Sequence, residues 1–134
     1  MMVKKTLLIL AAVLALGSSV PAAGAALSKD FNCVPIEVAV LDNRAHVLCA
    51  EPQPKYRGGY PVDNGDRIAY FAVPLSDANL SSRFIQVGNT AMAAGITIRF
   101  SYISGDYSGE AFGCDRANCR VPWAFALEKV AWSP

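Results

Sequence analysis

The placement of four cysteines constrains this chain more than any other feature of its sequence. All of them lie after residue 32: Cys33, Cys49, Cys114 and Cys119. An even number of cysteines in an exported chain is typical of disulfides, which four residues can form in three ways. Cys114 and Cys119 flank a short loop, so a local bridge there is natural and leaves Cys33 with Cys49. Zinc is the alternative, but a second close pair is missing and the only histidine, His46, is distant in the sequence.

The first 25 residues have the three-part pattern of a secretory signal peptide. Lys4 and Lys5 precede an uncharged apolar run over 7–16, and Ala23-Gly24-Ala25 supplies an A-x-A cleavage site. The run is about half as long as the ~20 residues that a spanning helix needs. We therefore expect an exported protein, periplasmic or secreted, without a membrane span. Its mature part, 26–134, is expected to fold as one domain.

Charge and composition exclude several classes of protein. Removing the leader leaves 10 of the 12 basic side chains against 11 acidic ones, so a strongly basic nucleic-acid binder is excluded. With 53% hydrophobic and 17% charged residues, the chain matches neither a disordered protein nor a coiled coil.

Hydrophobic periodicity predicts five strands. They are expected over 34–41, 45–50, 67–73 and 96–102 and from 123 onwards, the last with a bulge before Val130. The third, RIAYFAV, is a nearly unbroken apolar run, which is typical of a central strand covered on both faces. A long loop over 51–66 precedes it and contains an Asn64-Gly65 turn. The aromatic side chains at strand spacing are interpreted as core: Tyr70, Phe71, Phe100, Trp123 and Phe125. Exposure of Trp123 or Trp132 would instead suit a subunit interface.

One helix is predicted between the third and fourth strands. Ser76 or Asp77 supplies its N-terminal cap and Gly95 ends it. Gly88 weakens the segment by about 1 kcal/mol relative to alanine. The face that packs on the sheet repeats at helical spacing: Leu80, Phe84, Val87 and Ala91.

The order β-β-β-α-β-β indicates the fold class. It is the element order of an OB-fold, so we expect a mainly β protein with one helix, an OB-fold-like five-stranded small barrel and two disulfides. A flat α+β sandwich is the alternative architecture.

Three segments carry a resemblance to a known family: HVLCAEP over 46–52, GITIRFSY over 95–102 and GCDRANC over 113–119. Together with the signal peptide and a helix of small residues, this layout resembles the B subunits of bacterial AB5 toxins, most nearly that of subtilase cytotoxin. The resemblance covers most of the mature chain through spacing and element order. It implies a secreted, glycan-binding OB barrel that assembles into a pentamer. No receptor-contact serine of that family is carried over to this chain.

The segment KYRGGY, residues 55–60, is the most binding-like in composition. Aromatic rings stack on sugars, guanidinium groups bind anions and glycines admit a close backbone approach, so Tyr56, Arg57 and Tyr60 are candidates. The alternative is a loop whose tyrosine rings pack on the barrel.

The two loops that usually form the binding face of an OB-fold correspond to residues 42–44 and 104–120. The longer loop contributes three candidate contacts: Asp106, Tyr107 and Arg116.

No catalytic pattern is found in the sequence. HExxH and G-x-S-x-G motifs are absent. His46 has no evident partner, since no spacing supports a pair with Ser108, and is interpreted as a surface residue. Asp106, Glu110 and Asp115 are interpreted as solvated loop charges rather than a glycosidase pair or a calcium site.

These observations lead to one favoured hypothesis and two alternatives. The favoured hypothesis is an exported, non-enzymatic binding module without a cofactor or metal, resembling a toxin-like carbohydrate-binding subunit that binds a glycan or protein partner. The first alternative is a periplasmic inhibitory or structural protein that binds another protein through its glycine-rich loops. The second is a small hydrolase that uses His46, Ser108 and Asp106.

Overall fold

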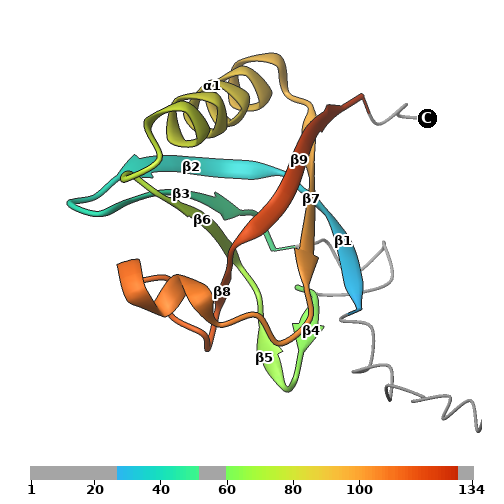
Figure 1. Ribbon diagram of the computed structural model, residues 1–134. Coiled ribbons are helices and arrows are strands. Elements are labelled where there is room, and N and C mark those ends of the chain that lie inside the picture. The colour runs from blue at the N-terminus through green and yellow to red at the C-terminus, as the bar shows by residue number, and fades with distance from the viewer. Residues whose placement is uncertain (1–26, 52–59, 130–134) are drawn as a thin grey trace, which may run out of the picture.

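The fold is mainly β with one α-helix (Figure 1). It contains two disulfides, and together these features confirm the predicted class. The structure is a computed structural model, and it describes residues 27–51 and 60–129. The leader over 1–25 lies outside these residues, as do Val130 and Trp132. The last strand pairs regularly from Ala124 to Glu128, and its register shift lies at its start rather than at the bulge expected before Val130. The disulfides join Cys33 to Cys49 and Cys114 to Cys119, as the spacing predicts.

Two sheets contain most of the strands. One is antiparallel with the order β1-β7-β9, and its strands are β1 (Ser28–Cys33), β7 (Thr97–Ile103) and β9 (Pro122–Glu128). The other has the order β2-β3-β6-β8, and its strands are β2 (Pro35–Val40), β3 (Arg44–Cys49), β6 (Tyr70–Pro74) and β8 (Cys119–Arg120). The short strands β4 (Val62–Asp63) and β5 (Asp66–Arg67) form a separate hairpin.

The sheets share two corners but do not close into a barrel, so that part of the prediction is wrong. The chain passes from β1 to β2 across Val34 and from β8 to β9 across Val121. With each of these pairs taken as one bent strand, the succession of neighbours follows the Greek-key arrangement of an OB-fold. Closure fails because only the two residues of β8 pair with β6, and the chain then leaves to join β7.

The predicted first strand begins too late in the sequence. Residues 28–33 already form β1, which pairs with β7 along its whole length. Its signal in the sequence was weak because Phe31 and Cys33 are its only apolar residues, and of these only Cys33 is fully buried. A register shift between Pro35 and Glu37 then leaves Ile36 exposed.

The predicted third strand divides into two elements. Arg67 belongs to β5, and β6 begins at Tyr70. The Asn64-Gly65 turn between β4 and β5 is confirmed, since both residues have positive φ, 51° and 87°. The centre of β6, Phe71 to Val73, is fully buried and so covered on both faces, as predicted.

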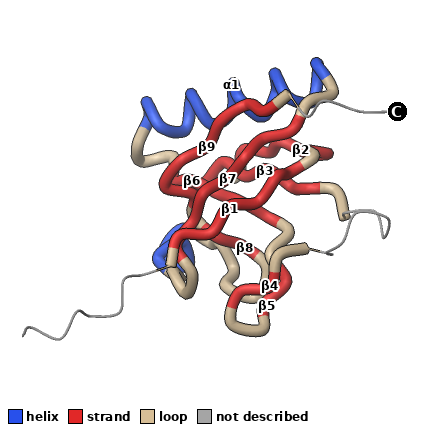
Figure 2. Tube along the Cα trace, turned by 90° about the vertical axis from the view of Figure 1, so that its right-hand side faces the viewer, coloured by secondary structure: helices blue, strands red, loops and turns tan. Residues whose placement is uncertain are grey.

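The helix α1 (Ala78–Ala94) has the predicted ends. Asp77 Oδ1 accepts a hydrogen bond from the Leu80 amide at 3.0 Å, and Gly95 ends the helix with a φ of 64°. Gly88 is a packing residue rather than a simple weakness, because a Cβ there would lie 2.7 Å from Val38 Cγ2. The helix covers one end of the sheets, while β8 and the β4–β5 hairpin lie at the opposite end (Figure 2).

The main core lies between α1 and the sheets. The ring of Phe71 stacks on Phe100 with centroids 4.3 Å apart, and Phe84 contacts both Phe100 and Phe125. Trp123 was expected in this core but is 62% exposed. A register shift in the β7–β9 pairing leaves it without a partner residue, which turns its side chain out of the core.

Candidate binding site

A pocket of about 250 Å³ opens beside β3 and β6, on the side away from the main core. Ala45, Val47 and Cys49 point from β3 into the core, so the alternate residues Arg44 and His46 lie on the opposite face. The other wall is the loop between β8 and the short 3₁₀-helix η1 (Ser108–Phe112). The lining residues are Arg44, His46, Tyr70, Gly113, Asp115, Asn118 and Cys119.

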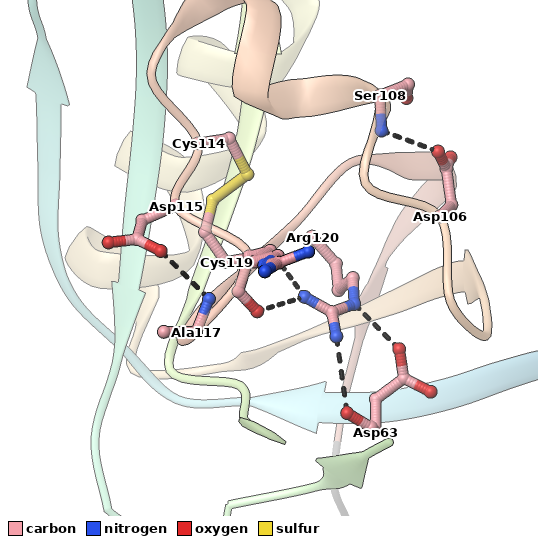
Figure 3. The surroundings of a disulfide bond; sticks show 9 residues. Asp63, Asp106, Ser108, Cys114, Asp115, Ala117, Cys119 and Arg120 are labelled. Carbon is pink, nitrogen blue, oxygen red and sulfur yellow. Dashed lines mark hydrogen bonds and ion pairs between the residues drawn. A yellow bond between two sulfur atoms is a disulfide. The ribbon is translucent and has the colours of Figure 1, made fainter. Parts of the chain in front are cut away.

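The Cys114–Cys119 disulfide holds the loop wall in place (Figure 3). Inside the loop, Asp115 Oδ1 accepts a hydrogen bond from the Ala117 amide at 2.9 Å. The Asn118 carbonyl accepts hydrogen bonds from the amides of Ala69 and Tyr70, which fixes the loop to the start of β6. The wall is therefore preorganised by a covalent bond and by main-chain hydrogen bonds.

The strand wall of the pocket supplies cationic and aromatic groups. His46 Nε2 lies 2.9 Å from Glu37 Oε1, and its ring packs at a tilt against Tyr70 with centroids 5.1 Å apart. Arg44 has no carboxylate within 4.0 Å among the residues in the described ranges. Its guanidinium lies so close to Gly113 that a Cβ there would overlap Nη1.

Glycine at position 113 is favoured by its φ of 85°, which side chains rarely adopt. A Cβ there would also displace the end of the flexible Arg44 side chain. The pocket thus presents a guanidinium, an imidazole, an amide, a carboxylate and a phenol ring within one small concavity. Such a set offers donors and acceptors to a small polar ligand and one flat face to an apolar one.

A fully buried ion pair lies behind the loop wall. Arg120 Nε donates to Asp63 Oδ2 at 2.7 Å, and neither side chain is exposed (Figure 3). Two carbonyls accept hydrogen bonds from Arg120 Nη1, that of Arg116 at 2.6 Å and that of Cys119 at 2.8 Å. The guanidinium therefore joins β4 to the disulfide loop.

The surroundings of Asp63 change the pKa of its carboxyl group. Burial alone raises the pKa of the Asp63 carboxyl, but donors from Ser104, Gly105, Arg120 and Lys29 outweigh that effect. The net result holds the pKa of Asp63 well below its usual range. Through its ion pair with Arg120, Asp63 supports the disulfide loop.

The structure brings together two of the three candidates from the longer loop. The Tyr107 ring lies under two guanidiniums, with Arg120 Cζ at 4.8 Å and Arg116 Cζ at 5.6 Å from its centroid. Its hydroxyl accepts a hydrogen bond from Asn64 Nδ2 at 3.2 Å. This cluster adjoins the buried ion pair and does not line the pocket, so its role in ligand contact stays a prediction.

The remaining candidates have other positions. Asp106 Oδ1 accepts a hydrogen bond from the Ser108 amide at 2.9 Å, which stabilises the turn before η1. The Tyr60 hydroxyl donates to the Cys49 carbonyl, its ring packs against the core, and burial raises the pKa of the Tyr60 phenol. Tyr56 and Arg57 lie outside the described residues.

Sequence reasoning missed two residues of the pocket. His46 was interpreted as an ordinary surface residue and Tyr70 as core, yet both line the concavity on the outer face of the sheet. The signal for His46 was its alternation with buried residues on β3. Neither Ser108 nor Asp106 lines the pocket with His46, so the arrangement does not assemble the set that the hydrolase hypothesis requires.

Two further searches cover the described residues only. No group of three or more His, Cys, Asp or Glu side chains there has a metal-binding arrangement. None of the helices in the same ranges is long and apolar enough to cross a membrane. Comparison of this chain with protein-family models, with curated proteins and with solved structures finds no match in any of the three.

Proposed function

We propose that this chain is an exported, non-enzymatic carbohydrate-binding module that holds a sugar residue in the pocket between the β3–β6 face and the 113–119 loop. One observation supports it above the others. The pocket lies where OB-folds bind oligosaccharides, on the face of the second and third strands beside the loop between the fourth and fifth.

The chemistry of the lining suits a sugar. Arg44 and the Asn118 amide offer donors to hydroxyl oxygens, Asp115 offers acceptors, and the Tyr70 ring offers a face for the C–H side of a pyranose. A volume of about 250 Å³ is below the ~300–1,000 Å³ of pockets for drug-sized ligands, which favours a single ring.

A glycan array probed with the oxidised, mature protein tests this proposal. We expect binding to a subset of glycans and a loss of at least tenfold in affinity in Asn118→Ala, whose exposed side chain lines the pocket while its main chain holds the loop. Asn89→Ala, an exposed substitution on α1, is the matched control and should bind as the unmodified protein does.

Two results would contradict the proposal. One is a folded, oxidised sample that binds no glycan on the array. The other is an equal effect of Asn118→Ala and Asn89→Ala on the glycans that do bind. An empty array together with one stoichiometric partner from an envelope extract would favour the protein-binding alternative.

We also propose that copies of the chain assemble into a ring, as the resemblance to toxin B subunits implies. Exposed apolar side chains on and beside β2 support it, namely those of Val34, Ile36 and Val40. Assembly would also raise the avidity of weak single-sugar sites. The native mass of the mature protein should be close to five times that of the chain, and a monomer at micromolar concentration would overturn the ring.

A further inference from the structure

A second concavity, of about 420 Å³, runs between α1 and β9 and shares no residue with the sugar pocket. One wall is the face of α1 that carries Leu80, Arg83, Gln86 and Val87. The other is β9 at Trp123, Ala124 and Phe125. We call this concavity the α1–β9 groove, and the two elements that form it lie together at the helical end of the molecule (Figure 1).

The main chain of β9 is open along one side. It pairs with β7 alone, and the gap between β9 and β6 is the place where the two sheets fail to close. Alternate residues of an edge strand direct their N–H and C=O groups away from the sheet. Within the described ranges, residues 123–128 make no hydrogen bond between main-chain groups beyond the β7 ladder, and the Glu128 carbonyl also accepts one from Thr97 Oγ1 of β7. The groups that an added strand requires are therefore present beside the groove.

The side chains of the groove specify what such a strand should carry. Leu80, Val87 and Phe125 provide a partly buried apolar surface. Arg83 provides a positive charge, because it has no carboxylate within 4.0 Å among the described residues and its Nε only donates to the Asn79 carbonyl at 3.4 Å. An extended peptide with alternating apolar and acidic residues would complement both.

Trp123 lines the groove at the start of β9, but its ring extends towards β1. The ring is 62% exposed, and its Nε1 donates to Ser28 Oγ at 3.1 Å, on the far side of β7 from β9. The contacts available to an added strand are therefore those of Leu80, Val87 and Phe125 and the open main chain of β9.

We propose that the α1–β9 groove binds an extended, acidic peptide segment of a partner protein, which adds to β9 as a further strand. The carboxylates of that segment lie near Arg83, and its apolar side chains lie against Leu80, Val87 and Phe125. This interaction is separate from sugar binding, so either proposal can fail alone.

A display library of random heptapeptides, selected on the oxidised mature protein, tests the proposal. We expect selected sequences enriched in acidic residues that protect the amides of β9 from hydrogen exchange when bound. Gln86→Trp, which fills the groove, should weaken binding at least tenfold. Asn89→Trp adds the same ring to the exposed side of α1 and should have no effect.

A separate control tests whether the peptide binds β9 through main-chain hydrogen bonds. Methylating alternate amide nitrogens of a selected peptide removes the donors that a strand needs, and binding should fall at least tenfold. The proposal is overturned if the library yields no binder, if the methylated peptide binds equally well, or if the two tryptophan variants behave alike. A native mass that falls in Gln86→Trp but not in Asn89→Trp would assign the groove to a second copy of the chain instead.

Discussion

At the scale of single residues, the Asp63–Arg120 pair accounts for the rigidity behind the pocket. Two oppositely charged groups without any exposure are stable only when each is fully hydrogen-bonded. No buried polar side-chain atom in the described part of the chain lacks a hydrogen-bond partner, so this condition is met. The pair joins residues separated by 57 positions, and no local pattern in the sequence could reveal it.

Removing the charge of Asp63 should destabilise the fold strongly. Asp63→Asn leaves Arg120 buried without a counter-charge, and we expect the free energy of unfolding to fall by about 3–5 kcal/mol. Denaturant unfolding of the oxidised protein measures it. Arg67→Gln is the control, because the exposed Arg67–Glu51 pair should contribute at most ~1 kcal/mol. Similar losses in the two variants would show that the buried pair is not a main source of stability.

The same carboxylate should make stability depend on acidity. Because the folded state lowers the pKa of Asp63, its contribution is complete above the unfolded value of about 3.9 and decreases as the pH falls below it. The free energy of unfolding, measured from pH 7 to pH 2, should therefore decline below about pH 4. In Asp63→Asn the decline should be shallower, and parallel curves would contradict this assignment.

At the scale of elements, α1 shows how packing overrides propensity. Alanine is preferred to glycine in helices by about 1 kcal/mol, which alone predicts that Gly88→Ala stabilises the protein. The contact between α1 and β2 predicts the opposite, because the new methyl group would lie 2.7 Å from Val38 Cγ2 and 3.2 Å from Val47 Cγ2. Overpacking of this kind costs about 1–3 kcal/mol.

We therefore expect Gly88→Ala to lower the melting temperature. In a Val38→Ala background only the contact with Val47 Cγ2, at 3.2 Å, remains, and the same substitution should lower the melting temperature less. Thermal unfolding of the four proteins of this double-mutant cycle measures the coupling. An increase in melting temperature for Gly88→Ala in both backgrounds would mean that helix and strand are less closely packed than described.

The two disulfides should differ in what they support. Cys33–Cys49 closes the longer loop, because its cysteines are separated by 16 positions and those of Cys114–Cys119 by 5. Replacing Cys33 and Cys49 by alanines should therefore lower the free energy of unfolding by about 3 kcal/mol, and replacing Cys114 and Cys119 by about 2 kcal/mol. Cys114–Cys119 fixes the pocket wall, so its loss should reduce sugar binding more than the loss of Cys33–Cys49 does. Unfolding and glycan titration of both double variants test this. Equal losses of binding would contradict the assigned role of the Cys114–Cys119 bond.

At the scale of the whole molecule, the sequence was sufficient to predict the class of fold. It was insufficient to predict that the sheets do not close into a barrel. Periodicity and cysteine spacing predicted the helix, both disulfides and the longer strands, because these follow from local pattern. They missed β1, and they missed the short strands β4 and β8, which lie in segments expected as loops, 51–66 and 104–120. The separation of the sheets depends on the two-residue pairing of β8 with β6, a long-range contact between short segments. A segment of two residues is too short to show a hydrophobic periodicity, so this pairing could not be predicted from the sequence.

The sequence indicated a segment that borders the pocket, but not the residues that line it. The longer loop, 104–120, supplies Gly113, Asp115 and Asn118 to the lining, whereas its named candidates Asp106, Tyr107 and Arg116 do not line the pocket and stay predictions. Tyr70 was missed because RIAYFAV is apolar at every position after Arg67, so the pattern does not show which face each side chain takes. Tyr56 and Arg57, outside the described residues, stay as predictions.

The most direct measurement of the central claim is a titration of the ¹⁵N-labelled, oxidised mature protein with the saccharide that binds best on the array, followed by amide chemical shifts. We predict that the shift changes concentrate at Arg44, His46, Tyr70 and residues 113–119, and that Asn118→Ala abolishes them. Changes confined to α1 and β9, or no changes at any concentration of the sugar, would contradict the assignment of the pocket as a sugar site.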